Sequence, residues 1–206
     1  MSHTFTLFEE GVPLAQAERA LLLFHGRGGN AQAILELGRA IAPAGTYLAA
    51  LQATNNTWYP YSFMAPVIDN QPWLDSALAN VQQLIEQTEK VLPSKQIYLM
   101  GFSQGACLTL ESAARFARPF GGVIAFTGGL IGQTLDTSPY QAQFAGTRIL
   151  MTNSDNDPHV PQSRSEESKA VLENLGAELN LVIYPGRAHI VSPEEQSLAK
   201  AFIFST

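Results

Sequence analysis

The sequence predicts an α/β fold in which helices flank both faces of a mostly parallel sheet. Short apolar runs of β-favouring residues alternate along the 206-residue chain with longer segments of helical periodicity. The apolar runs are continuous and do not alternate with polar residues, which is typical of strands covered on both faces. The repeating strand-helix order then favours a layered α/β arrangement.

Six candidate strands follow one another: ALLLF (20–24), TYLAAL (46–51), QIYLMGF (96–102), GVIAFTG (122–128), TRILMTN (147–153) and LNLVIYPG (179–186). The helical segments cover residues 30–42, 72–92, 104–117, 162–176 and 193–204. The N-terminal TFTLFEEG adds a candidate edge strand. No repeat, low-complexity tract or linker interrupts this order, so we expect residues 1–206 to form a single domain. No long insertion follows residues 122–128, which leaves no room for a helical cap domain.

The composition argues against several classes of function. Net charge is −6, with 46% hydrophobic and 15% charged residues, and the positive residues are scattered along the chain. A nucleic-acid partner is therefore not expected. Cys107 is the sole cysteine, which excludes an internal disulfide and a cysteine-based metal cluster. We expect a soluble cytoplasmic protein without integral membrane association, because we find no signal peptide and no apolar run approaching ~18 residues.

Three of the predicted strand ends carry Ser, Asp and His in turn. Parallel sheets of this kind bind ligands at the carboxyl ends of their strands. One of these ends reads GFSQG, residues 101–105, and matches the G-x-S-x-G nucleophile elbow around Ser103. The alternative is an ordinary strand-to-helix turn rich in small residues. The position between a predicted strand and a predicted helix favours the elbow.

A serine hydroxyl needs a base within hydrogen-bond reach to act as a nucleophile. His189 follows the last predicted strand in the segment YPGRAHIV and fits the chain order nucleophile, acid, histidine. His3 is expected at a frayed terminus, and His25 precedes the serine and is expected to brace its own loop. His159 lies in the candidate acid loop and is the one serious competitor. We therefore predict His189 as the base.

Asp155 and Asp157 compete for the third role, which is to orient the imidazole and stabilise its positive charge. Both follow a predicted strand, in a loop where aspartates commonly form turns. Asp157 lies deeper in the loop and precedes Pro158. We predict Asp157 as the acid and Asp155 as a turn former.

Donors for a developing oxyanion are expected from two backbone N–H groups. One belongs to Gln104, directly after the serine, and the other to Arg27 in the glycine-rich loop FHGRGGNA. The same loop lacks the G-x-G-x-x-G spacing and the later acidic residue of a dinucleotide site, so we reject that alternative. The side chains of Arg27 and Arg187 are expected to be solvated or salt-bridged. A sharper hypothesis is that Arg27 favours substrates that bear a carboxylate.

Residues from about Ala20 to Phe204 resemble the phospholipase/carboxylesterase family of α/β-hydrolases, the group that contains the acyl-protein thioesterases. The segments HGRGGNA, WYPYSF, GFSQGA, DPHVP and GRAHIV carry the resemblance. It implies the α/β-hydrolase fold, assigns the triad acid to Asp157 and places the oxyanion hole at Arg27 and Gln104. It is also compatible with a homodimer. The chain departs from the family at Ala106, where a second glycine is frequent, and at Arg27, where the thioesterases commonly carry leucine.

Aromatic residues cluster at another predicted strand end, in the segment NNTWYPYSFMAP. Loop aromatics often cover the core, and the alternative is one wall of an apolar substrate pocket. We predict Trp58, Tyr59 and Phe63 as substrate-binding residues, with Leu130 on the other wall. Cys107 lies four residues after the predicted nucleophile and is expected to face the core.

These expectations describe a serine hydrolase of carboxylic esters, in which Ser103, His189 and Asp157 act together without a metal or organic cofactor. The substrate is expected to be a small-molecule ester or thioester. An alternative on the same residues is hydrolysis of acyl-thioesters or lysophospholipids. A less favoured alternative is a non-catalytic binding protein with this fold.

Overall fold

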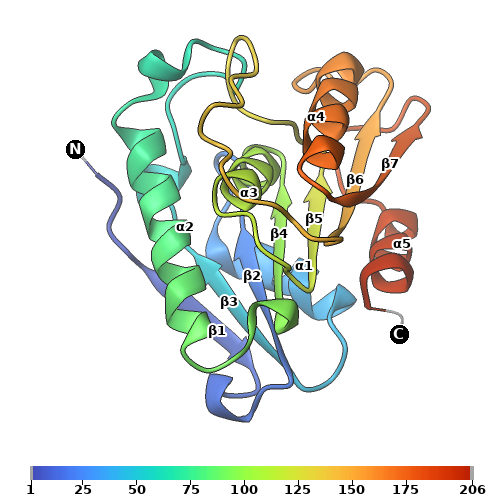
Figure 1. Ribbon diagram of the computed structural model, residues 1–206. Coiled ribbons are helices and arrows are strands. Elements are labelled where there is room, and N and C mark those ends of the chain that lie inside the picture. The colour runs from blue at the N-terminus through green and yellow to red at the C-terminus, as the bar shows by residue number, and fades with distance from the viewer. Residues whose placement is uncertain (1, 205–206) are drawn as a thin grey trace.

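The computed structural model describes residues 2–204, which contain a seven-stranded sheet (Figure 1). The strands are β1 (Leu7–Gly11), β2 (Arg19–Phe24), β3 (Thr46–Leu51), β4 (Ile97–Phe102), β5 (Gly122–Phe126), β6 (Arg148–Ser154) and β7 (Glu178–Tyr184). Their order across the sheet is β1-β3-β2-β4-β5-β6-β7, and all neighbouring pairs are parallel except β1 with β3. The predicted α/β fold, with its N-terminal edge strand, is confirmed.

Helices cover both faces of this sheet. They are α1 (Ala31–Ile41), α2 (Trp73–Glu89), α3 (Gln104–Arg115), α4 (Gln162–Asn174) and α5 (Pro193–Phe204), with short 3-10 turns at Leu14–Gln16, Thr54–Asn56, Val67–Asn70 and Ser94–Gln96. Helices α1 and α5 pack on one face, and α2, α3 and α4 pack on the other (Figure 1). Residues 127–147, between β5 and β6, form no helix or strand, so the described chain has no helical cap there.

The central strands are buried on both faces, as their continuous apolar sequences predict. In β2, every residue from Ala20 to Phe24 is 0% exposed. Successive side chains point to opposite faces, so Leu22 packs in the layer of α2 and α3, and Leu23 packs in the layer of α1 and α5. Burying each such side chain stabilises the fold by about 1.5–3 kcal/mol. The sheet is therefore a well-packed support for the loops at its carboxyl edge.

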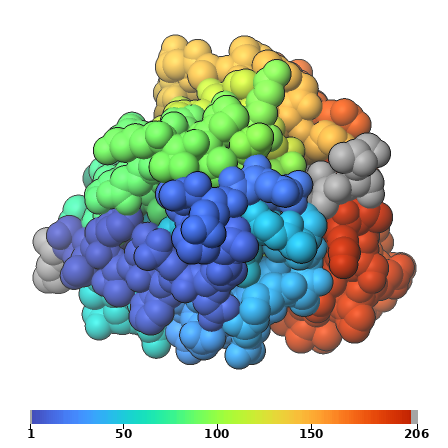
Figure 2. Space-filling model, turned by 90° about the horizontal axis from the view of Figure 1, so that it is seen from below, coloured from blue at the N-terminus to red at the C-terminus, as the bar shows by residue number. Residues whose placement is uncertain are grey.

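The parallel strands begin at the opposite end of the molecule (Figure 1). Figure 2 views that end from below, where the N-terminal residues in blue lie between the green segment and the light-blue segment. No helix within residues 2–204 is long and apolar enough to cross a bilayer.

The prediction of a frayed terminus at His3 is wrong. The His3 side chain is buried, its Nε2–H donates to the Trp58 carbonyl oxygen at 2.8 Å, and its Nδ1 accepts the Thr54 N–H at 3.1 Å. These two hydrogen bonds hold the N-terminal segment against the loop after β3. A single-sequence pattern does not reveal such bonds, because the partners lie more than 50 residues away.

Candidate active site

Ser103 lies at the junction of β4 and α3, at the carboxyl edge of the sheet. Its backbone has φ 55° and ψ −119°, a strained conformation that non-glycine residues rarely adopt. Two glycines make the turn sterically possible. A Cβ on Gly101 would lie 2.2 Å from the Gly105 oxygen, and a Cβ on Gly105 would lie 2.0 Å from the Phe24 oxygen. The predicted elbow geometry is therefore present, and an ordinary turn would not need this strain.

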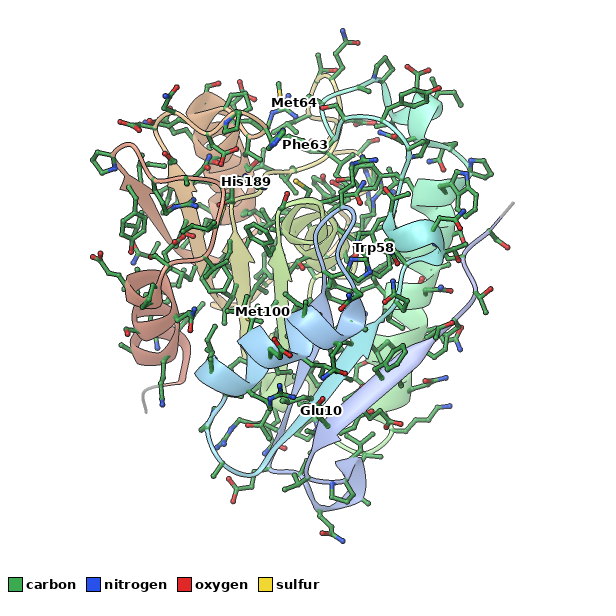
Figure 3. The ribbon with its side chains drawn as sticks, turned by 180° about the vertical axis from the view of Figure 1, so that it is seen from behind. Glu10, Trp58, Phe63, Met64, Met100 and His189 are labelled. Carbon is green, nitrogen blue, oxygen red and sulfur yellow. The ribbon has the colours of Figure 1, made fainter. Side chains whose placement is uncertain are left out.

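His189 lies on the loop after β7, at the same edge of the sheet as Phe63 (Figure 3). Its Nδ1 is 2.7 Å from Asp157 Oδ2, and its Nε2 is 2.8 Å from Ser103 Oγ. Because an ionised carboxylate can only accept, Nδ1 carries the proton and donates to Asp157. Nε2 of the neutral ring then accepts the Ser103 hydroxyl. The three predicted side chains, far apart in the sequence, thus form one hydrogen-bonded chain.

The Asp157 carboxylate is held in its ionised form. Burial on its own would raise the pKa of Asp157, but hydrogen bonds from His189 and from the backbone N–H groups of His159 and Val160 outweigh it and lower the pKa. The two backbone bonds, both 2.9 Å long, go to Oδ1, so Asp157 also forms the turn that the sequence analysis expected of Asp155. A negative charge next to Nδ1 is what a positively charged imidazole requires.

Asp155 has a different partner. Its Oδ1 accepts the backbone N–H of Gly186 at 2.8 Å, which ties the loop after β6 to the loop after β7. Asp155 is exposed and makes no contact with His189 among the interactions of the described chain. Of the two candidate aspartates, the structure therefore brings only Asp157 to the imidazole.

Arg187 and Glu195 form a buried support behind His189, a role that is not evident from the sequence. The Arg187 guanidinium donates to the carbonyl oxygens of Ala188 and Ile190, and to Thr127 Oγ1 at 2.6 Å. Its Nε lies 3.4 Å from the Glu195 carboxylate, which has no exposed side-chain surface. Arg187 is therefore hydrogen-bonded to the backbone on both sides of His189. The salt bridge expected for Arg187 is present, but it points inward.

The two predicted oxyanion donors have unused backbone N–H groups. Among the described residues, neither the Arg27 N–H nor the Gln104 N–H donates to a protein acceptor. Gln104 begins α3, where the first N–H groups of a helix lack intrahelical partners. Gly26 brings the Arg27 loop to Ser103, since a Cβ on Gly26 would lie 3.4 Å from the Ser103 Cβ. Both N–H groups are thus free to bind an oxyanion.

A cavity of about 530 Å³ opens beside Ser103 and His189. It is here called the polar cavity because Arg27, Ser103 and Gln104 bring polar groups to an otherwise largely apolar wall. It is lined by Arg27, Tyr59, Pro60, Tyr61, Ser62, Phe63, Ser103, Gln104, Cys107, His159, Val160 and His189. Two of the predicted substrate-binding residues, Tyr59 and Phe63, are therefore at its wall. Burial raises the pKa of the Cys107 thiol to about 12, so this lining residue is neutral at physiological pH.

Trp58 and Leu130, the other two predicted substrate-binding residues, do not line the polar cavity. Both are 0% exposed. The Trp58 indole N–H donates to the His25 carbonyl oxygen at 2.8 Å, and the Leu130 N–H donates to Ser168 Oγ at 2.9 Å. These hydrogen bonds draw both residues into the core, and this part of the prediction is corrected.

A second cavity of about 380 Å³, here the apolar cavity, lies on the other side of His189. Its walls combine α1 side chains with the loop after β7, and they include Ala33, Ile34, Leu37, Phe102, Ile190 and Val191. His25 and His189 also touch it. Arg27 and His189 line both cavities, so the two cavities meet at the candidate catalytic residues.

Neither His159 nor His25 takes the position of the base beside Ser103. The His159 ring packs edge-on against His189, with ring centroids 4.8 Å apart and an interplanar angle of 78°. It lies at the polar cavity and does not contact Ser103 in the base position. His25 is buried, its Nδ1–H donates to Gly26 O at 2.7 Å, and its Nε2 accepts the Ala53 N–H at 3.1 Å. His25 therefore braces its loop, as expected.

Solved structures of similar shape support this description of the fold. A phospholipase/carboxylesterase from Dyadobacter fermentans is 47% identical, with a TM-score of 0.97, and the alignment covers 100% of this chain and 99% of that one. A structure described as YahD with malic acid has a TM-score of 0.77 at 21% identity, covering 98% of both chains. At that identity the second likeness concerns the fold alone.

Curated relatives are more distant. A probable carboxylesterase from Oryza sativa subsp. japonica is 30% identical over 135 residues, which are 63% of this chain and about half (51%) of the rice protein. An acyl-protein thioesterase 1 from Eremothecium gossypii is 26% identical over 206 residues, covering 91% of this chain and 87% of that protein. The family model described as phospholipase/carboxylesterase matches residues 12–206. The chain therefore belongs to the phospholipase/carboxylesterase family.

Proposed function

We propose that this protein is a carboxylic ester hydrolase with Ser103 as nucleophile, His189 as general base and Asp157 as the orienting acid. The observation that carries the proposal is the hydrogen-bonded chain from Asp157 Oδ2 through the imidazole to Ser103 Oγ, with contacts of 2.7 and 2.8 Å. Membership of the phospholipase/carboxylesterase family supports the same reaction class.

In the proposed reaction, Ser103 Oγ attacks the carbonyl carbon of the ester while its proton passes to His189 Nε2. The negative oxygen that forms is bound by the backbone N–H groups of Gln104 and Arg27, and each such donor is worth on the order of 3 kcal/mol. The carbon–oxygen bond to the alcohol then breaks, and His189 returns the proton to the leaving oxygen. Water, activated by His189, releases the acid from Ser103 in the same manner.

The two cavities suit the two parts of an ester. The polar cavity contains Ser103 and Gln104, so it is the natural place for the acyl group that stays on the serine. The apolar cavity contains His189 and no Ser103, and His189 is the group that protonates the alcohol as it leaves. We therefore propose that the apolar cavity accepts a hydrocarbon leaving group.

Hydrolysis of acyl-thioesters is the second candidate, because the Eremothecium gossypii relative is named an acyl-protein thioesterase. The same residues would perform both reactions, since only the leaving atom differs. Lysophospholipids are a third substrate class for the same site. The predicted single domain, cytoplasmic location and homodimer stay predictions, and light scattering would measure the assembly.

A serine-directed fluorophosphonate probe tests the proposed nucleophile. We expect covalent labelling of the wild-type protein and of Ser197→Ala, which alters an exposed serine on α5, but not of Ser103→Ala. Ester turnover by Ser103→Ala should fall at least on the order of 10⁴-fold while its circular dichroism spectrum stays unchanged. A panel of short esters, acyl-thioesters and lysophospholipids then separates the substrate classes. Labelling or full turnover of Ser103→Ala would reject the mechanism.

A further inference from the structure

Arg27 carries a positive charge into the polar cavity without a carboxylate partner. The chain has eight arginines, and six form ion pairs with Asp or Glu: Arg19, Arg39, Arg115, Arg118, Arg164 and Arg187. Among the described residues, Arg27 and Arg148 have no such pair. Both lie over aromatic rings, Arg148 at 4.1 Å from the Phe202 centroid and Arg27 at 5.9 Å from the Tyr59 centroid. Of these two arginines, Arg27 is the one that lines the polar cavity beside Ser103.

The Arg27 guanidinium is fixed in place by neutral acceptors. Nη1 donates to Thr57 Oγ1 at 3.0 Å and to Pro60 O at 2.9 Å, and Nη2 donates to Tyr61 O at 2.6 Å. These acceptors belong to the loop after β3, whose Phe63 and Met64 lie at the same end of the molecule as His189 in Figure 3. Holding an arginine in one conformation has an entropic cost of up to about 2 kcal/mol, and the bonds leave its charge uncompensated.

The free donors of Arg27 match the needs of a carboxylate. A guanidinium has five N–H groups, and three are used by the loop, which leaves the Nε–H and one Nη2–H. Two N–H groups of one guanidinium are what a carboxylate engages when it binds arginine bidentately. Arg27 is therefore held ready to bind an anion.

The rest of the polar cavity offers donors and no competing negative charge. Its lining contains no Asp or Glu. The Asp157 carboxylate behind His189 has no exposed side-chain surface and already accepts from three N–H groups. The exposed His159 ring reaches the cavity, and its nitrogens make no hydrogen bond within residues 2–204. The lining of the polar cavity thus lacks the acidic side chains that give the whole protein its net charge of −6.

We propose that the polar cavity binds an acyl group that ends in a carboxylate, with Arg27 as its charged donor and His159 as a second donor. The substrate class is then the half-ester of a short dicarboxylic acid, with its hydrocarbon alcohol in the apolar cavity. This inference rests on the proposed ester hydrolysis for its substrate, but anion binding by Arg27 can be measured separately.

Two esters that differ only in charge test the inference. Monoethyl glutarate carries a carboxylate where the ethyl ester of glutaric acid monoamide carries a neutral amide. We expect the wild-type protein to prefer the anionic ester, measured as the ratio of the two kcat/KM values. Arg27→Met should reduce this ratio on the order of 10- to 100-fold, because the cost of losing a hydrogen bond to a charged group is of that size. High salt should weaken the preference.

The matched control is Arg148→Met, which removes the same charge at the start of β6 without touching the cavity. It should leave the ratio within about twofold of the wild type, because Arg148 is at the end of β6 away from the cavity and charges beyond a Debye length of about 10 Å are largely screened. His159→Phe keeps an aromatic ring and removes both nitrogens, so a smaller decrease in the ratio is expected. If Arg27 only supports the loop, Arg27→Met will lower both kcat/KM values equally and the inference fails.

Calorimetric titration with glutarate separates this inference from the proposed function. Binding to wild-type protein that weakens in Arg27→Met but not in Arg148→Met supports the anion site, even if neither ester is hydrolysed. Absence of glutarate binding to the wild type, or equal weakening in both variants, overturns it. If the wild-type protein binds glutarate but hydrolyses no ester, the hydrolase proposal is rejected and the anion site is supported.

Discussion

Replacing Arg187 by methionine removes a guanidinium that supports the His189 loop from inside the protein. In the native structure this group donates to the backbone carbonyls on both sides of His189 and to Thr127 Oγ1. It also lies beside the buried Glu195 carboxylate. We predict that Arg187→Met lowers both thermal stability and ester turnover, for two separable reasons.

The stability loss follows from the burial of the ion pair. The Arg187 and Glu195 side chains are 7% and 0% exposed, so removing the cation leaves a buried carboxylate without a compensating charge. Breaking such a pair typically costs about 3–5 kcal/mol. The Arg187 Nε–H makes no hydrogen bond within residues 2–204, and its 3.4 Å contact with Glu195 is electrostatic only. We therefore expect the free energy of unfolding to decrease by an amount at the low end of this range, about 3 kcal/mol. For a 206-residue protein, Tm should then fall by about 6–12 °C.

The double variant Arg187→Met/Glu195→Leu separates charge from positioning. Replacing both partners by apolar residues removes the uncompensated carboxylate, which should restore stability. It also removes the acceptor of the Thr152 hydroxyl and of the Ser192 N–H, so only part of the lost Tm should return. The donors to the backbone around His189 remain absent, and kcat should stay on the order of tenfold to a hundredfold below wild type, because small displacements of a catalytic group have effects of that size. Differential scanning calorimetry and steady-state ester kinetics measure the two quantities.

Two results would contradict this reasoning. A Tm for Arg187→Met within about 2 °C of wild type would mean that Glu195 does not depend on Arg187. A double variant that regains both Tm and full kcat would mean that the guanidinium stabilises the fold without positioning His189.

Three further predictions concern the acid, the elbow and the buried histidines. Asp157→Asn should lower kcat on the order of 10⁴-fold by losing the tautomer with Nδ1–H, and a loss below about tenfold in steady-state kinetics would contradict its role. Gly105→Ala should unfold or severely destabilise the protein, since its Cβ would lie 2.0 Å from a backbone oxygen, whereas Gly28→Ala meets nothing within 4 Å. Urea denaturation should show a cost for Gly28→Ala of only about 1–2 kcal/mol from its positive φ. Burial lowers the pKa of both His3 and His25, so below about pH 6.5 the unfolded chain binds protons that the folded chain excludes. The free energy of unfolding should therefore decrease as the pH is lowered, by up to about 1.4 kcal/mol per pH unit for each histidine. Equal values at about pH 7.5 and 5.5 would contradict this.

The fold was predictable because the central strands are buried on both faces and leave unbroken apolar runs in the sequence. The element ends were less predictable. The strand expected at 122–128 ends at Phe126, because Thr127 takes φ 58° and leaves the extended conformation. The strand expected at 179–186 ends at Tyr184, before Gly186 takes φ 65°. Both ends are set by turns whose backbone angles the residue types alone do not specify.

The contacts of the candidate triad were predictable because each residue follows a strand at the same edge of one parallel sheet. The orientation of individual side chains was not. Trp58 and Tyr59 are neighbours of similar character, yet only Tyr59 lines the polar cavity, because the Trp58 indole finds a buried acceptor. Arg187 and Glu195 are eight residues apart and resemble ordinary surface charges in the sequence. Their burial depends on how the loop after β7 folds back over the sheet.

The three residues of the candidate triad are supported in different ways, and this difference determines where the site is vulnerable. Ser103 directly follows β4, and the close packing of Gly101 and Gly105 surrounds its strained backbone. Asp157 and His189 lie on loops that are joined by the Asp155–Gly186 hydrogen bond. A perturbation of the elbow must therefore disturb the core and lower stability. A perturbation of the loop tie, such as Asp155→Ala, acts on an exposed bond and should lower kcat with a Tm change of at most about 2–4 °C. If Asp155→Ala instead lowered Tm strongly at unchanged kcat, the two loops would belong to the structural core and would not serve mainly to align the imidazole.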